Sequence, residues 1–123
     1  MALTTKGCNF VLDSLGANTP AHTTITHASL HTASPGDSEA NELTAGAASY
    51  ARKSISFGAA SSKVMNSDGV DPVFNVSAGV TVSYVGFYTA LTGGHCLAWA
   101  NVTDEVFGSN GTYTLTDAQF GQS

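Results

Sequence analysis

Residues 29–37 read Ser-Leu-His-Thr-Ala-Ser-Pro-Gly-Asp, and residues 49–53, beyond a short acidic loop, read Ser-Tyr-Ala-Arg-Lys. This pattern predicts a strand that ends in a Pro-Gly turn, then a polar loop, then a second strand. Pro35 fixes its own φ angle and lacks an N–H donor, and Gly36 readily adopts a positive φ. The first strand must therefore stop at this turn.

Further β-type runs follow, separated by turn residues. The expected strands are residues 23–32, 49–57, 73–76, 80–88, 96–102 and 112–116. The pair Gly93-Gly94 between two apolar runs is typical of a hairpin turn. Together these runs predict a mainly β fold, an antiparallel β-sandwich (jelly-roll-like) with one short N-terminal helix, in a single domain over residues 1–123. The expected core residues are Leu12, Leu30, Ile55, Phe57, Phe74, Val76, Val82, Phe87 and Trp99.

The helix is expected near Thr5 to Leu15. Apolar residues recur there at i, i+3, i+4 and i+7, which places them on one helical face: Cys8, Val11, Leu12 and Leu15. Thr4 or Thr5 can cap its N-terminus, and Gly16 stands where a C-terminal glycine belongs. Gly7 inside the helix weakens it by about 1 kcal/mol.

The composition is low in charge and rich in small residues. Charged residues make up 11% of the chain, and the formal net charge is −5, whereas an ordinary soluble domain has about 25% charged residues. A surface of small side chains favours a protein covered by neighbours in an assembly, although a secreted or low-charge soluble domain remains an alternative. So few basic residues argue against nucleic-acid binding, and no apolar run reaches the length of a membrane span.

The residues offer little for catalysis or cofactor binding. His27 and His31 share one face of the expected strand but lie about 13 Å apart, too far to hold one metal ion. They are expected to be surface or interface histidines, hydrogen-bonded to Ser and Thr. Cys8 and Cys96 are expected to be reduced, because no secretion signal precedes them. Neither a nucleophile elbow nor a phosphate-binding loop is present, so we expect no enzyme and no cofactor.

Three stretches, residues 29–53, 73–82 and 86–94, resemble a family of small virion proteins of tailed bacteriophages, usually described as tail fibre or minor tail proteins. The resemblance covers roughly Leu3 to Thr116 and carries no catalytic signature. It implies a non-enzymatic structural protein that is made in the host bacterial cytoplasm and assembles into the virion. Its expected partners are other virion proteins and copies of itself, with a trimer favoured by analogy.

Two alternatives stay open beside the tail-fibre or minor tail interpretation. One is a capsid decoration protein that bridges major capsid subunits, since small β-rich proteins do both jobs. The other is a carbohydrate-binding module for receptor recognition, which needs at least two aromatic rings exposed in a line.

The polar loop at residues 37–48 is the candidate interface. We expect it to pack on a neighbouring subunit or another virion protein, with Asp37, Glu39 or Glu42 facing a basic partner residue. The alternative is a solvated loop without a partner. Tyr50 and Arg52, on one face of the strand that follows, complete the set of interface candidates.

Overall fold

The computed structural model describes residues 2–16, 24–62, 64–68, 71–116 and 119–121. Its elements in chain order are β1 (Ala2–Leu3), α1 (Thr5–Leu15), β2 (His27–His31), the 3₁₀ turn η1 (Gly36–Ser38), β3 (Lys53–Ser54), β4 (Ser56–Phe57), β5 (Val64–Asp68), β6 (Val73–Val76), β7 (Val80–Tyr88), β8 (Cys96–Phe107), β9 (Gly111–Thr114) and β10 (Gln119–Gly121).

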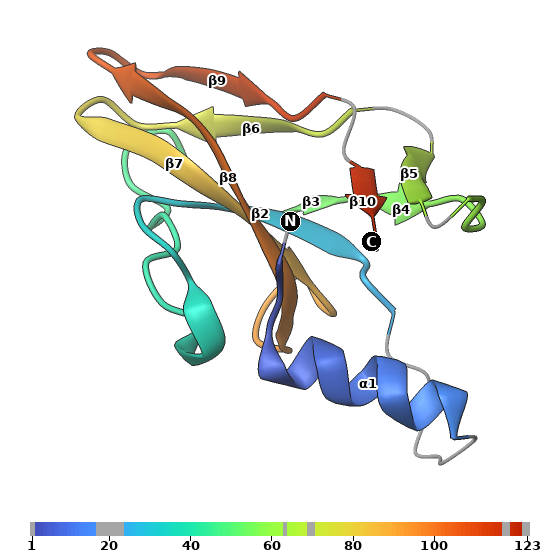
Figure 1. Cartoon of the computed structure of the whole chain (residues 1–123). Coiled ribbons are helices and arrows are strands. Elements are labelled where there is room, and N and C mark those ends of the chain that lie inside the picture. Colours follow the sequence, from blue (N-terminus) through green and yellow to red (C-terminus); the bar gives the residue numbers. More distant parts are fainter. Residues whose placement is uncertain (1, 17–23, 63, 69–70, 117–118, 122–123) are drawn as a thin grey trace.

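The strands form antiparallel sheets of five, three and two strands (Figure 1). The main sheet has the order β1-β8-β7-β2-β3, a second sheet has the order β10-β5-β4, and β6 pairs with β9. The β6–β9 ribbon lies above β7 and β8 in Figure 1, and α1 lies below the strands. A mainly β, antiparallel fold with one helix is therefore confirmed, while a jelly-roll-like strand order stays a prediction.

The core lies between one face of the main sheet and β6. The register places Ala28 beside Phe87 and Leu30 beside Val85, so these four side chains share a face. They join one buried cluster with other residues of β7 and β8, with β6 and with residues from the loops: Leu43, Tyr50, Ile55, Phe74, Val76, Val82, Ala98, Phe107 and Leu115. Two layers thus bury a common apolar interior.

Most of the expected core is confirmed. The residues that are at least nine-tenths buried are Leu30, Ile55, Phe74, Val76, Val82 and Phe87. Phe57 packs against the cluster but is only half-buried, and so is Trp99. The prediction for Leu12 is wrong, because its side chain is 63% exposed. Helical periodicity identifies an apolar face but does not say which face meets the body of the protein.

The helix begins and ends where the sequence predicts, but it turns a different face inward. Thr4 caps it by accepting a hydrogen bond from the N–H of Gly7 at 3.1 Å. Gly7 is its buried residue, and a Cβ there would lie 2.1 Å from the carbonyl oxygen of Leu97 in β8. The glycine thus allows the helix to approach β8 closely. Gly16 ends the helix with a φ of −84°, so the left-handed cap is not formed.

The strand predictions differ from the structure mainly at element ends. The bounds of β6 and β7 agree with the prediction, and Gly93-Gly94 forms its turn with positive φ at both glycines. The run predicted for residues 49–57 divides into β3 and β4, which belong to different sheets. In addition, β8 extends five residues beyond the predicted Val102, and β5 was not predicted. Polar residues in these two stretches conceal the alternation that marks a half-buried strand.

Replacing Phe74 by Ala should lower the free energy of unfolding by about 3–5 kcal/mol, because the ring is fully buried and leaves a cavity. Leu91→Ala is the matched control and should change it by less than about 0.5 kcal/mol, because that side chain is 52% exposed. Urea unfolding measures both values. Equal losses for the two variants would contradict the assignment of inside and outside.

Candidate interaction site

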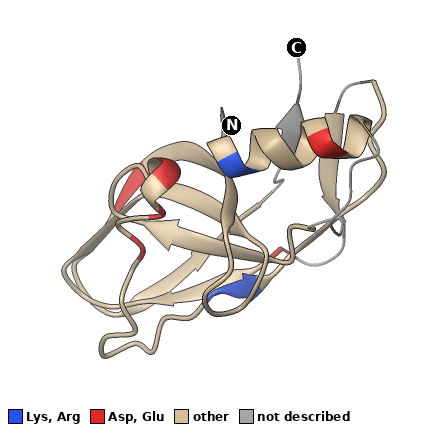
Figure 2. Ribbon diagram, turned by 90° about the horizontal axis from the view of Figure 1, so that it is seen from below, with Lys and Arg blue, Asp and Glu red and all other residues tan. Residues whose placement is uncertain are grey.

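All five interface candidates lie in residues 37–52, the segment that leads from the end of β2 to the start of β3. The segment contains the 3₁₀ turn η1 and otherwise irregular backbone, and it returns to β2, where Glu42 bridges to His31. Other charged residues are distributed over the rest of the ribbon (Figure 2), among them the adjacent pair Asp104 and Glu105. The segment itself holds three carboxylates and one guanidinium within a short stretch of sequence.

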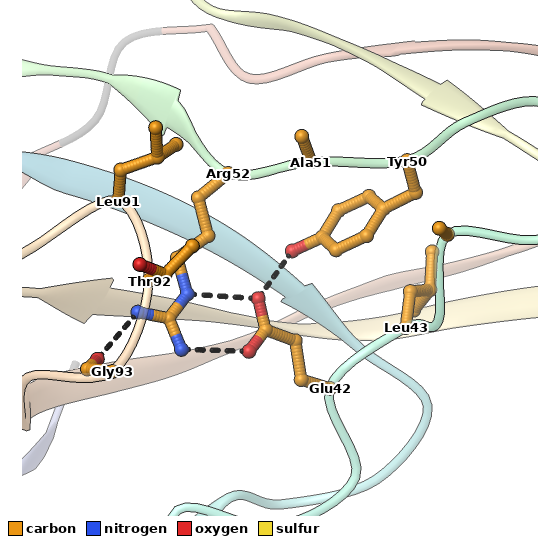
Figure 3. A pocket seen from close by; sticks show the side chains of 9 residues that line it. Glu42, Leu43, Tyr50, Ala51, Arg52, Leu91, Thr92 and Gly93 are labelled. Carbon is orange, nitrogen blue, oxygen red and sulfur yellow. Dashed lines mark hydrogen bonds and ion pairs between the residues drawn. The ribbon is translucent and has the colours of Figure 1, made fainter.

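Glu42 and Arg52 form the central ion pair of this segment (Figure 3). The Arg52 Nε and Nη2 atoms donate to the two carboxylate oxygens of Glu42 at 2.9 and 2.8 Å. Burial alone would raise the pKa of Glu42, but the hydrogen bonds from Arg52 and Tyr50 outweigh it and hold that pKa below its usual range. The carboxylate is therefore charged at neutral pH and fixed by two-point contact.

Arg52 also ties the segment to the turn between β7 and β8. Its Nη1 atom donates to the carbonyl oxygens of Ala90 at 3.0 Å and Gly93 at 2.8 Å. The guanidinium carbon lies 3.6 Å from the centre of the Tyr88 ring, a cation–π contact. Four of the five guanidinium N–H groups are thus occupied inside the chain. Arg52 retains little capacity to bind an external anion.

Tyr50 completes the hydrogen bonding along the outer edge of β2. That edge pairs with β3 at His27 and Ala28, and the Leu30 carbonyl accepts from the N–H of Leu43 at 3.0 Å. Between these contacts the N–H of Leu30 donates to the Tyr50 hydroxyl at 3.0 Å, and the hydroxyl donates to Glu42 at 2.8 Å. Burial raises the pKa of Tyr50 far above its ordinary value, so the phenol stays protonated as a donor.

Asp37 and Glu39 hold the first turn of α1. The backbone N–H of Thr5 donates to Asp37 at 2.8 Å, and the Thr5 hydroxyl donates to the same carboxylate. The Lys6 ammonium lies 2.7 Å from Glu39, which also accepts from the N–H of Cys96 at 3.2 Å. The helix has no acidic residue in its own first turn, so Asp37 supplies the negative charge that a helix N-terminus favours.

The expectation that His31 lies at the surface or at an interface is wrong, because the residue is fully buried, on the face of the main sheet opposite the core cluster. Its Nε2 atom hydrogen-bonds to the Ser29 hydroxyl, and its Nδ1 atom to the Ala40 carbonyl, both at 2.8 Å. Its ring stacks on Tyr88 with the centroids 6.1 Å apart. Gly86 makes room for this arrangement, because a Cβ there would lie 2.8 Å from Nε2. Desolvation lowers the pKa of His31, so the ring is neutral near pH 7.

An open depression of about 400 Å³ lies beside the Glu42–Arg52 pair (Figure 3). Its lining consists of Glu42, Leu43, Ala45, Tyr50, Ala51, Arg52, Leu91, Thr92 and Gly93. The polar groups that point toward it, the carboxylate, the phenol and the guanidinium, are already paired with one another. The depression could therefore accommodate a ligand by its volume, but it has few free polar groups to hydrogen-bond one.

The structure brings Glu42, Tyr50 and Arg52 into contact with one another, whereas Asp37 and Glu39 contact the start of α1. All three carboxylates therefore have partners within the chain. Glu42 meets Arg52, Glu39 meets Lys6, and Asp37 meets Thr5. A contact of these residues with a neighbouring protein stays a prediction. Sequence reasoning missed Tyr88 and the central place of His31. Their signal was weak, because an aromatic residue at a strand end and a histidine among serines and threonines are both common.

Other chemistry is sparse in the part of the chain that the structure describes. No group of three or more His, Cys, Asp or Glu side chains there could hold a metal ion. Cys8 is exposed and Cys96 is buried, and neither forms a disulfide. None of the aromatic rings whose burial is described is more than partly exposed, so the row of exposed rings that sugar binding needs is not seen. None of the described helices is long and apolar enough to span a membrane.

Comparison with protein families identifies the relatives of this chain. A family model described as "Podophage GP4 fiber I protein gp80" matches residues 2–119. No curated protein matches the chain. Because the family model covers nearly the whole sequence, the chain belongs to this family of phage fibre proteins, which confirms the resemblance found in the sequence.

Replacing Tyr50 by Phe should lower the free energy of unfolding by about 1–3 kcal/mol, because the buried N–H of Leu30 loses its acceptor and Glu42 loses a donor. Tyr84→Phe is the matched control, since the Tyr84 hydroxyl has no hydrogen bond to the described residues, and it should change the value little. Chemical denaturation measures both. If the two variants were equally stable, the phenol would not hold this edge.

The free energy of unfolding should fall as the pH falls through 6.5, the ordinary pKa of histidine. Below that pH the unfolded chain takes up a proton that buried His31, with its lowered pKa, does not, so protonation favours unfolding. Denaturation at about pH 7.5 and about pH 5.5 measures the loss. His31→Gln should show a smaller loss than wild type. An undiminished loss in His31→Gln would contradict the assignment.

Proposed function

We propose that this member of the podophage fibre family is a non-enzymatic structural component of the virion tail fibre that works by assembling with copies of itself and with other virion proteins. The family match supports the fibre assignment. The low charge and the polar groups paired within residues 37–52 support a structural role, because they leave few groups free for chemistry. Synthesis in the host cytoplasm and incorporation into the virion belong to the same proposal.

The observation that supports self-association is the exposed apolar face of α1, formed by Cys8, Val11, Leu12 and Leu15. Val11 is 42% exposed, Leu12 63% and Leu15 80%. Figure 1 shows the helix running away from the strands below the main sheet. Adjacent exposed apolar side chains of this kind mark an interaction surface more often than a free one.

The polar contacts that hold the helix to the rest of the described chain lie at its beginning. Its N-terminal turn has the Thr4 cap, the Asp37 carboxylate and the Lys6–Glu39 ion pair. An isolated helix of 11 residues is marginally stable in water, and most helical stability in proteins comes from packing of the apolar face. Since this face meets none of the described residues closely enough to be buried, a partner that covers it would stabilise the helix.

We propose that this face packs against the same face of α1 in other copies of the chain. Cys8, Val11 and Leu15 are spaced by three and four residues, the spacing of a helix–helix seam. The exposed residues around them, Thr5, Asn9 and Ser14, carry no charge. Lys6 and Asp13, the two charged residues of the helix, are each only partly exposed. Copies can therefore approach along this face without repulsion, and a trimer remains the favoured state by analogy with phage fibres.

The double variant Leu12→Ser/Leu15→Ser should sediment as a monomer where the wild-type chain sediments as an oligomer, because two apolar side chains of the exposed face are lost. Its melting temperature at low protein concentration should be close to that of the wild type, since both side chains are exposed. Leu91→Ser is the matched control, because Leu91 is 52% exposed but lies outside α1, and it should stay oligomeric.

A wild-type chain that is monomeric at high micromolar concentration, or a double variant that remains oligomeric, would refute the α1 seam. Immunogold labelling of intact particles tests the placement separately. Label on the tail supports the fibre proposal, whereas label spread over the capsid shell would replace it by the decoration role.

A further inference from the structure

The outer edge of β8 is largely open in the described chain. β8 runs from Cys96 to Phe107 and pairs with β7 along one edge. On its other edge, β1 pairs only with Ala98 and Trp99. Among the described residues, no strand pairs with the outer edge from Ala100 onward. An open edge presents N–H and C=O groups that can pair with a strand of another chain.

This open edge carries negative charge without a partner. Asp104 and Glu105 are exposed and form no ion pair with the described residues. Val106 beside them is 73% exposed, so the edge also offers apolar surface. Two β8 edges brought together would place these carboxylates near one another, and like charges opposite each other are destabilising. The charge therefore disfavours pairing of β8 with β8 and favours a basic strand.

A basic edge lies at the opposite side of the same sheet. β3, the last strand in the order β1-β8-β7-β2-β3, contains Lys53. Lys6 is paired with Glu39 and Arg52 with Glu42, whereas Lys53 forms no ion pair within the described residues. The sheet thus has an unpaired cation at one edge and two unpaired carboxylates at the other.

We propose that the open edge of β8 in one copy pairs with the β3 edge of the next copy, with Lys53 near Asp104 and Glu105. The contact joins two different surfaces, so it is heterologous and either closes into a ring or extends as a filament. A trimeric ring and a fibre are both compatible with it. The inference rests on the proposed self-association but involves β8 and β3 instead of α1. The β8–β3 contact and the α1 contact can therefore be tested separately.

Charge reversal tests the pairing. Asp104→Lys/Glu105→Lys and, separately, Lys53→Glu should each weaken association at least tenfold by sedimentation, because each places like charges at the contact. The triple variant Asp104→Lys/Glu105→Lys/Lys53→Glu should recover association, because the charges are then exchanged between the edges. Asp71→Lys is the control, because Asp71 lies outside both β8 and β3 and outside α1. Circular dichroism and melting of each variant show whether it folds.

Hydrogen exchange gives a readout that does not depend on a variant. The amides of residues 101–106 that point outward should exchange more slowly at high than at low protein concentration. Reversal variants that associate like the wild type, a triple variant that does not recover, or exchange independent of concentration would each overturn the pairing. The same exchange measurement on the Leu12→Ser/Leu15→Ser variant separates the two contacts. If the β8 amides still exchange more slowly at high protein concentration, the edge contact persists without the α1 seam, and the seam is refuted while the edge pairing stands.

Discussion

The hydroxyl of Tyr50 occupies the position on which the rest of this structure depends. β2 needs a partner along its outer edge, but β3 covers only its first residues, and the loop around Glu42 meets only its end. The phenol fills the gap by accepting from Leu30 and donating to Glu42. An unsatisfied N–H in this buried place would cost about as much as a lost hydrogen bond. One side chain thus joins the sheet to the loop.

The same loop determines how the helix is presented. Glu42 and Arg52 fix its far end to the turn between β7 and β8, and Asp37 and Glu39 fix its near end to α1. The helix is thereby fixed at its N-terminus and pointed away from the strands. The loop and β8 contact the beginning of the helix, and among the described residues its apolar face stays exposed. The acidic residues of this loop therefore make contacts within the chain that connect α1 to the strands.

Local signals predicted the elements well and their assembly less well. The bounds of α1, β6 and β7 follow from apolar periodicity and turn residues, which act over a few positions. Leu12 was misplaced because an apolar helical face looks the same whether its own chain or a neighbour covers it. The sequence singled out the acidic residues of the loop as interface candidates, and that role stays a prediction. Their partners within the chain, Lys6 and Arg52, could not be assigned, because those pairings depend on how distant segments meet.

The sequence by itself determined a mainly β chain with one short helix, a low charge and a phage fibre family. These properties depend on residue type and local spacing, which the order of residues contains directly. Only the tertiary structure decided that Tyr50 completes the edge of β2, that Gly7 allows α1 to reach β8, and that Asp37 meets the start of the helix. Each of these contacts joins residues that are distant along the chain, so the path of the backbone between them had to be known first.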